Sequence, residues 1–218
     1  MQIKLHQLGK RYRFDWIYRG LDAEFPPGSR VAITGPNGSG KSTLLRSICG
    51  YLTPTEGRIQ YLQSGRSVDR DEVYRSVAYA APYVELIEEF TLRELLDFQR
   101  QFFHFEGNRS TDELIERMEL KRAGKKEIRF FSSGMKQRLK LALAICSTRP
   151  LLILDEPTTN LDAAGAAWYL DLIEEFGGEK TIFVASNVEG DFAFCDRHLS
   201  ILDHKPKRRK RRGLLKNE

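Results

Sequence analysis

The chain has 218 residues, of which 41% are hydrophobic and 30% are charged, a composition that describes an ordinary soluble globular protein. Because no run of about 18 apolar residues occurs and no apolar secretion segment opens the chain, the sequence predicts a cytoplasmic protein without a membrane-spanning helix. The net charge is +5, but residues 205–218 carry eight Lys or Arg and one Glu, so the rest of the chain is slightly acidic.

The first part of the chain predicts β-structure. Residues 3–8 alternate apolar and polar side chains as a half-buried strand does, and residues 16–18 and 23–25 indicate a second strand. A turn is expected at 26–29, and a short buried strand follows over 29–34. This last strand leads directly into the most informative segment.

Residues 35–43 read GPNGSGKST and fill the phosphate-loop template G-x-x-x-x-G-K-[ST]. Backbone N–H groups converge on a polyphosphate only where no Cβ stands in the way, which requires glycine at the tight positions. Lys41 supplies a charge for the outer phosphates, and the Ser42 hydroxyl can ligate Mg²⁺. A helix predicted over 42–49 adds the positive end of its dipole beneath the anion. The alternative is a glycine-rich turn that matches by chance.

The middle of the chain changes from strand to helical periodicity. Strands are expected at 58–62 and 73–80. Thr91 and Glu94 then form a capping box at the start of the first of three amphipathic helices. These helices are predicted over 91–103, 111–120 and 132–147. Three consecutive helices within a strand–helix alternation predict a helical subdomain, about 83–147, inserted into an α/β core.

Residues 151–157, LLILDEP, form an uninterrupted apolar run that ends in two acids, typical of a strand covered on both faces. Asp155, at the C-terminal edge of this strand, can hold Mg²⁺ opposite the phosphate loop. Glu156 faces a different direction and is suited to polarise the water that attacks a γ-phosphate. The last predicted elements are a helix and two strands, over 163–176, 181–185 and 199–202.

A third motif lies just ahead of the acidic strand. Residues 131–138, FSSGMKQR, are similar to the LSGGQ signature of the ATP-binding cassette (ABC) ATPases, a family that the sequence resembles over nearly its whole length. The resemblance implies an α/β fold with a P-loop NTPase-type mixed sheet core, an N-terminal antiparallel β part and the inserted helical subdomain. It implies one cassette over 1–204 and a basic tail over 205–218.

The resemblance also implies cofactors and a partner. In the family, the signature serine and its helix N-terminus contact the γ-phosphate bound by the other cassette of a head-to-tail dimer. ATP, Mg²⁺ and a second cassette, either identical or different, are therefore expected. Residues 159–162, TNLD, resemble the D-loop that crosses the dimer interface. Tyr12 stands where the family stacks an aromatic ring on adenine, the alternative being a half-buried strand residue.

The predicted site residues fall into three groups. The ATP-binding residues are Tyr12, Gly35, Pro36, Asn37, Gly38, Ser39, Gly40, Lys41, Ser42, Thr43, Ser132, Ser133 and Gly134. The metal ligands are Ser42 and Asp155, and the catalytic residues are Glu156 and Asn187.

Two positions depart from the family pattern. The family's Gln ahead of the helical subdomain falls on Pro82, which has no side-chain carbonyl to approach Mg²⁺ and stiffens the loop. The family's switch histidine falls on Asn187, which can donate a hydrogen bond to a γ-phosphate but takes no charge near neutral pH. Because the phosphate loop, Asp155 and Glu156 are intact, we expect weakened hydrolysis rather than loss of ATP binding.

The basic run over 207–212 leaves three roles open. One role is that of a solvated tail without a partner. A second is a contact to the anionic inner membrane surface beside a permease. A third is a contact to nucleic acid, but the run has no interleaved aromatic residues, which argues against this role.

The function favoured by the resemblance is an ATP-binding and ATP-hydrolysing subunit at the cytoplasmic face of a membrane, which powers separate transmembrane permease subunits. The alternative is a soluble ABC ATPase that acts on ribosomes or nucleic acid. Such relatives usually carry two cassettes or a long coiled-coil insertion, and this sequence has neither.

Overall fold

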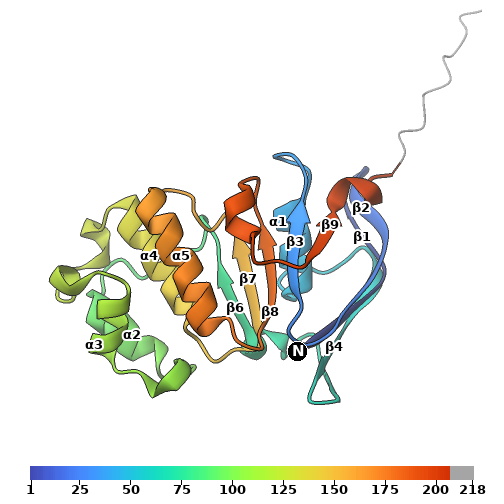
Figure 1. Cartoon of the computed structure of the whole chain (residues 1–218). Helices are drawn as coiled ribbons and strands as arrows, with labels where there is room; N and C mark the ends of the chain where they lie inside the picture. The colour runs from blue at the N-terminus through green and yellow to red at the C-terminus, as the bar shows by residue number, and fades with distance from the viewer. Residues whose placement is uncertain (207–218) are drawn as a thin grey trace, which may run out of the picture.

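The computed structural model describes residues 1–206, in which a four-stranded sheet, a five-stranded sheet and a group of helices lie side by side (Figure 1). The smaller sheet is antiparallel, with strand order β2-β1-β4-β5. Its strands are β1 (Gln2–Tyr12), β2 (Asp15–Phe25), β4 (Glu56–Gln63) and β5 (Arg66–Val68). The predicted N-terminal antiparallel part is therefore confirmed, and the basic run predicted at 207–212 lies outside the described residues.

The larger sheet is parallel throughout and has the order β6-β7-β8-β3-β9. Its strands are β3 (Arg30–Thr34), β6 (Val77–Ala80), β7 (Leu151–Asp155), β8 (Thr181–Ala185) and β9 (Arg197–Ser200). Every residue of β7 and β8 is buried, as expected for central strands covered on both faces. The carboxyl ends of all five strands consequently meet at one edge of the sheet.

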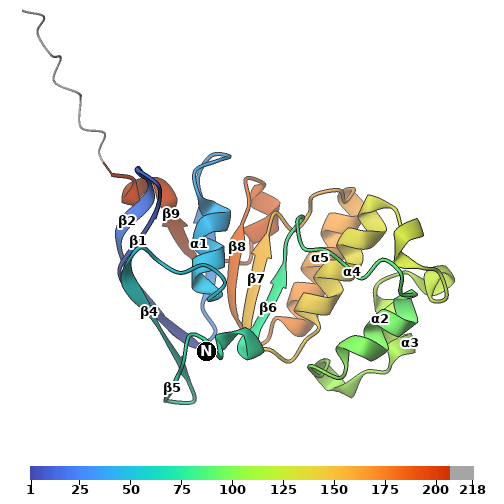
Figure 2. The same ribbon diagram turned by 180° about the vertical axis from the view of Figure 1, so that it is seen from behind.

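Helices cover both faces of the parallel sheet (Figures 1 and 2). They are α1 (Lys41–Ile48), α2 (Leu92–Gln99), α3 (Thr111–Arg117), α4 (Ser133–Ile145) and α5 (Ala163–Phe176). Alternate residues of β7 enter two apolar cores: Leu151 and Ile153 join the core that contains α1, and Leu152 and Leu154 join the core of α2 to α5. Full burial of each such side chain contributes about 1.5–3 kcal/mol, which holds β7 between the two cores.

The capping box predicted for the first amphipathic helix is present at the start of α2. Thr91 Oγ1 accepts a hydrogen bond from Glu94 N at 3.3 Å, and Thr91 N donates to Glu94 Oε2 at 2.8 Å. A second capping box, which the sequence analysis did not predict, joins Ser110 and Glu113 at α3. The helix predicted to reach residue 103 was too long, because α2 ends at Gln99 and leaves Phe102 exposed.

Other boundaries also differ from expectation. The strand predicted over 73–80 is confined to β6, since Val73–Ser76 forms a turn of 3₁₀-helix. The limits predicted for the helical subdomain, 83–147, stay a prediction, because one continuous apolar core joins α2, α3 and α4 to α5 and the sheet. Among residues 1–206, no helix has the length and apolar character needed to cross a bilayer.

Candidate functional site

The carboxyl ends of four neighbouring parallel strands form the candidate site. The phosphate loop follows β3 and lies beyond the end of that strand (Figure 1). Asp155 ends β7, and Asn187 follows β8 by two residues. Tyr83 follows β6 by three residues. Because parallel strands bring their carboxyl ends to one edge, residues that are far apart in sequence meet here.

Three glycines of the phosphate loop adopt the left-handed region that side chains disfavour. Their φ angles are 146° at Gly35, 72° at Gly38 and 109° at Gly40. A Cβ on Gly40 would lie 2.2 Å from Ile17 Cγ2, and one on Gly35 would lie 2.8 Å from Ile201 Cγ2. Glycine therefore serves close packing of the loop against its neighbours as well as access to the backbone amides.

Lys41 is buried and joins the phosphate loop to the loop after β8. Its Nζ donates hydrogen bonds to the Gly35 carbonyl at 2.8 Å and to Asn187 Oδ1 at 3.0 Å, and it lies 3.8 Å from Glu156 Oε1. Asn187 Nδ2 in turn donates to Asn37 Oδ1. The structure thus brings the predicted residues of three separate segments together around one ammonium group.

Asp155 and Glu156 diverge, as the sequence analysis expected. Asp155 is 1% exposed; its Oδ2 accepts a hydrogen bond from the Tyr83 hydroxyl at 2.7 Å, and its Oδ1 is buried without a partner among residues 1–206. Glu156 has a φ of 47°, in the strained left-handed region. Burial raises the pKa of Glu156, against the opposing effect of the Lys41 ammonium, which suits a carboxylate that accepts a proton.

These residues fit a magnesium nucleotide. The loop glycines place no Cβ over the backbone amides, and Ser42 lies in the first turn of α1, whose N-terminus favours an anion. A buried carboxylate oxygen such as Asp155 Oδ1 requires a partner, and Mg²⁺ prefers oxygen ligands. The predicted metal pair, Ser42 and Asp155, therefore stays a prediction that the donor chemistry supports.

The signature segment lies apart from the phosphate loop. Ser132 caps α4, its Oγ accepting a hydrogen bond from Met135 N at 3.3 Å, and both Ser132 and Ser133 are exposed. A Cβ on Gly134 would lie 3.1 Å from the Asn160 carbonyl oxygen, so this segment adjoins the predicted D-loop. Figures 1 and 2 both place α4 and α1 on opposite sides of β6 and β7. One chain therefore does not bring the two motifs together.

The predicted adenine contact, Tyr12, ends β1 and is 47% exposed. Lys10 Nζ lies 5.2 Å from the centre of the Tyr12 ring. Stacking of this ring on adenine stays a prediction.

Sequence reasoning missed two residues of the site, Tyr83 and Asp191. Asp191 is buried; its Oδ1 accepts a hydrogen bond from Thr158 Oγ1 at 2.7 Å and its Oδ2 one from Ser186 Oγ at 2.6 Å. It therefore fixes the loop after β7 to the loop after β8. No motif could have revealed it, because it lies in a polar turn of unremarkable composition.

Comparisons with known proteins agree with this arrangement. The profile of the family described as ABC transporter matches residues 18–159. The chain is 34% identical over 201 residues to the daunorubicin resistance ATP-binding protein DrrA3 of Streptomyces coeruleorubidus, covering 89% of this chain and 63% of that protein. It is 31% identical over 190 residues to the cytochrome c biogenesis ATP-binding export protein CcmA of Agrobacterium fabrum, covering 85% and 88%.

A solved structure shares the fold. A dimeric ATP-binding cassette in a post-hydrolysis state, bound to ADP and Pi, superposes with a TM-score of 0.78 at 24% identity, covering 91% of this chain and 93% of that one. Fold and site thus define an ATP-binding cassette ATPase of the P-loop NTPase type. The chain belongs to the ABC transporter family. It spans 62% to 66% of the length of four curated relatives, DrrA3 among them.

Proposed function

We propose that the chain binds and hydrolyses ATP with Mg²⁺ and thereby powers transport by permease subunits that are separate chains. One observation carries this proposal: Lys41, Glu156 and Asn187 converge within hydrogen-bond or ion-pair distance at the carboxyl edge of the parallel sheet. These groups come from three loops, and each has a chemical role toward a triphosphate.

The proposed roles follow from donor chemistry. The loop amides and Lys41 hold the outer phosphates, while Ser42 and Asp155 would hold Mg²⁺, which when bound neutralises phosphate charge. Glu156 polarises the attacking water, and Asn187 donates a hydrogen bond to the γ-phosphate. Because Pro82 offers no side-chain carbonyl and Asn187 takes no charge, hydrolysis is slow relative to binding.

A second cassette, identical or different, completes the site. Ser132, Ser133 and Gly134 stand at the exposed start of α4, on the far side of the sheet from the phosphate loop of their own chain. A head-to-tail arrangement presents this helix N-terminus to nucleotide bound by the partner. The post-hydrolysis cassette that shares the fold is dimeric, which supports the same assembly here.

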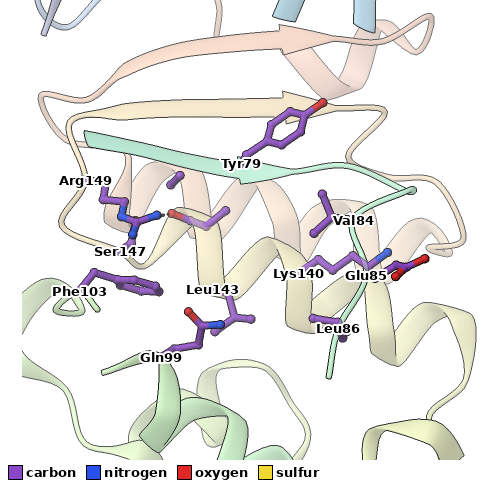
Figure 3. A pocket seen from close by; sticks show the side chains of 12 residues that line it. Tyr79, Val84, Glu85, Leu86, Gln99, Phe103, Lys140, Leu143, Ser147 and Arg149 are labelled. Atoms are coloured by element: carbon purple, nitrogen blue, oxygen red, sulfur yellow. Dashed lines mark hydrogen bonds between the residues drawn. The ribbon is translucent and has the colours of Figure 1, made fainter. Parts of the chain in front are cut away.

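A cavity offers a place for the permease. Its volume is about 150 Å³, and it lies between β6, α2 and α4, beside the segment that leads from β6 to α2 (Figure 3). Gln99 and Phe103 lie on one side, and Lys140 and Leu143 of α4 on another. We propose that a cytoplasmic segment of the permease docks at this cavity, which holds the chain at the cytoplasmic face of the membrane. CcmA is named as an export protein, which supports a transport role.

Nucleotide binding tests the proposal directly. The purified chain should bind ATP more tightly in the presence of Mg²⁺ than in its absence, and Lys41→Ala should abolish that binding, because it removes the charge on the outer phosphates. Lys125→Ala, at an exposed position, is the matched control. Wild-type protein without Mg²⁺-dependent affinity for ATP would overturn the proposal.

Co-purification distinguishes the transporter from the alternative. Multi-span membrane proteins recovered with the chain from detergent-solubilised membranes support the permease assignment. Ribosomes or nucleic acid recovered in their place would support a soluble ABC ATPase.

A further inference from the structure

A tight turn directs Tyr83 into the nucleotide site. Val84 N donates a hydrogen bond to the Ala81 carbonyl at 3.1 Å, which closes a four-residue turn with Pro82 at its second position, where proline is favoured. The Pro82 carbonyl accepts a hydrogen bond from Lys140 Nζ at 2.7 Å, so the turn is also fixed to α4. The proline that stands in place of the expected glutamine therefore sets the position of the residue that follows it.

The side chain of Tyr83 is held on two sides. The Arg46 guanidinium lies 4.1 Å from the centre of the Tyr83 ring, and Arg46 Nε donates to the Tyr83 hydroxyl at 3.2 Å. The Tyr79 hydroxyl is also hydrogen-bonded to that of Tyr83. The Tyr79 side chain packs against the core that contains α1. Because a carboxylate oxygen accepts, the single proton of the Tyr83 hydroxyl is donated to Asp155, which leaves this hydroxyl to accept from Arg46 and Tyr79.

That proton goes to Asp155. The Tyr83 hydroxyl donates to Asp155 Oδ2 at 2.7 Å, whereas Asp155 Oδ1 is buried and has no partner among the described residues. The carboxylate thus has one oxygen fixed by a neutral donor and one oxygen free for a further ligand. A partner that fixes a metal ligand in this way typically changes metal affinity about 10–100-fold when it is removed.

We propose that Tyr83 is a positioning residue for the metal of this site: its hydroxyl holds Asp155 Oδ2 and so reserves Asp155 Oδ1 for Mg²⁺. The inference rests on the proposed function, since it concerns the same Mg²⁺-nucleotide site. Pro82 stands where the family pattern has a glutamine, so no side-chain carbonyl approaches Mg²⁺ from this position. Tyr83 instead acts on the metal site through its hydrogen bond to Asp155.

The test compares Tyr83→Phe with wild type. Phenylalanine keeps the ring that packs on Arg46 and removes only the hydroxyl. Each protein is saturated with a nonhydrolysable ATP analogue and titrated with Mn²⁺, bound metal being followed by electron paramagnetic resonance and corrected with the analogue alone. Tyr74→Phe is the matched control, because Tyr74 is exposed and its hydroxyl contacts Arg75, away from Asp155.

We expect Tyr83→Phe to weaken Mn²⁺ binding about 10–100-fold and to change the resonance line shape. Tyr74→Phe should leave both unchanged. Affinity for the analogue in EDTA should be equal in all three proteins, which also shows that the variants are folded. Unchanged or tighter Mn²⁺ binding in Tyr83→Phe would overturn the inference alone, whereas wild-type protein that binds no metal–nucleotide complex would overturn the proposed function.

Discussion

Lys41 Nζ donates a hydrogen bond to Asn187 Oδ1 across 3.0 Å, although 146 positions separate the two residues. The contact joins the phosphate loop after β3 to the loop after β8, because β3 and β8 are neighbours in the parallel sheet. Asn187 also donates to Asn37, so its amide uses both its acceptor and its donor on the phosphate loop. Asn187 therefore contacts the loop directly, so a phosphate bound in the loop would change its hydrogen bonds.

Replacement of Glu156 by Gln should slow ATP turnover about 10²–10⁴-fold, since that is the usual contribution of a positioned acid–base group. ATP affinity should change little, because Lys41 and the loop amides are retained. Steady-state phosphate release and equilibrium nucleotide binding measure the two effects. Glu174→Gln, an exposed position on α5, serves as the control. Equal turnover in wild type and Glu156→Gln would remove Glu156 from the mechanism.

Asn187→His should raise turnover, because histidine can carry charge near the γ-phosphate and asparagine cannot. Asn187→Ala should instead weaken nucleotide binding, since it deletes the side-chain amide that we propose donates to the γ-phosphate. Phosphate release and equilibrium nucleotide binding are measured for the two variants and for wild type. If histidine leaves the rate of ATP hydrolysis unchanged or lowers it, the natural asparagine does not slow hydrolysis.

Ser132→Ala should affect both stability and dimer formation. Loss of the α4 cap costs about 0.5–2 kcal/mol in the free energy of unfolding, measured by urea denaturation. Thr91→Ala removes the equivalent cap of α2 and should cost a similar amount. Only Ser132→Ala should reduce ATP-driven dimer formation in sedimentation experiments. Equal dimer formation in the two variants would argue against a role of Ser132 at the partner's nucleotide.

Loop glycines permit a positive φ and also permit close packing against neighbouring residues, and Gly40→Ala and Gly38→Ala separate these two roles. Both substitutions place a side chain at positive φ, at about 1–2 kcal/mol each. The added Cβ at Gly40 meets Ile17, whereas nothing lies within 4 Å of one at Gly38. Gly40→Ala should therefore destabilise the fold by about 1–3 kcal/mol more than Gly38→Ala in urea denaturation. Equal losses would show that the contact with Ile17 relaxes without cost.

Elements with a strong local pattern could be predicted from the sequence. The helix over 163–176 has the predicted limits, because its apolar spacing is regular and Gly177-Gly178 follows it. The four apolar residues before Asp155 predicted a buried strand, and β7 is buried throughout. Where the pattern was ambiguous, prediction failed: Val73–Ser76 has strand-like composition but forms a 3₁₀ turn.

The sequence by itself determined the phosphate loop, the acidic strand end and the cap of α2, since each depends on residues a few positions apart whose chemistry is local. Only the tertiary structure decided that Tyr83 bonds to Asp155 and that Asp191 joins Thr158 to Ser186. These contacts arise because parallel pairing sets the order of the strands and brings their carboxyl ends to one edge. No local pattern records which distant side chains then share that edge.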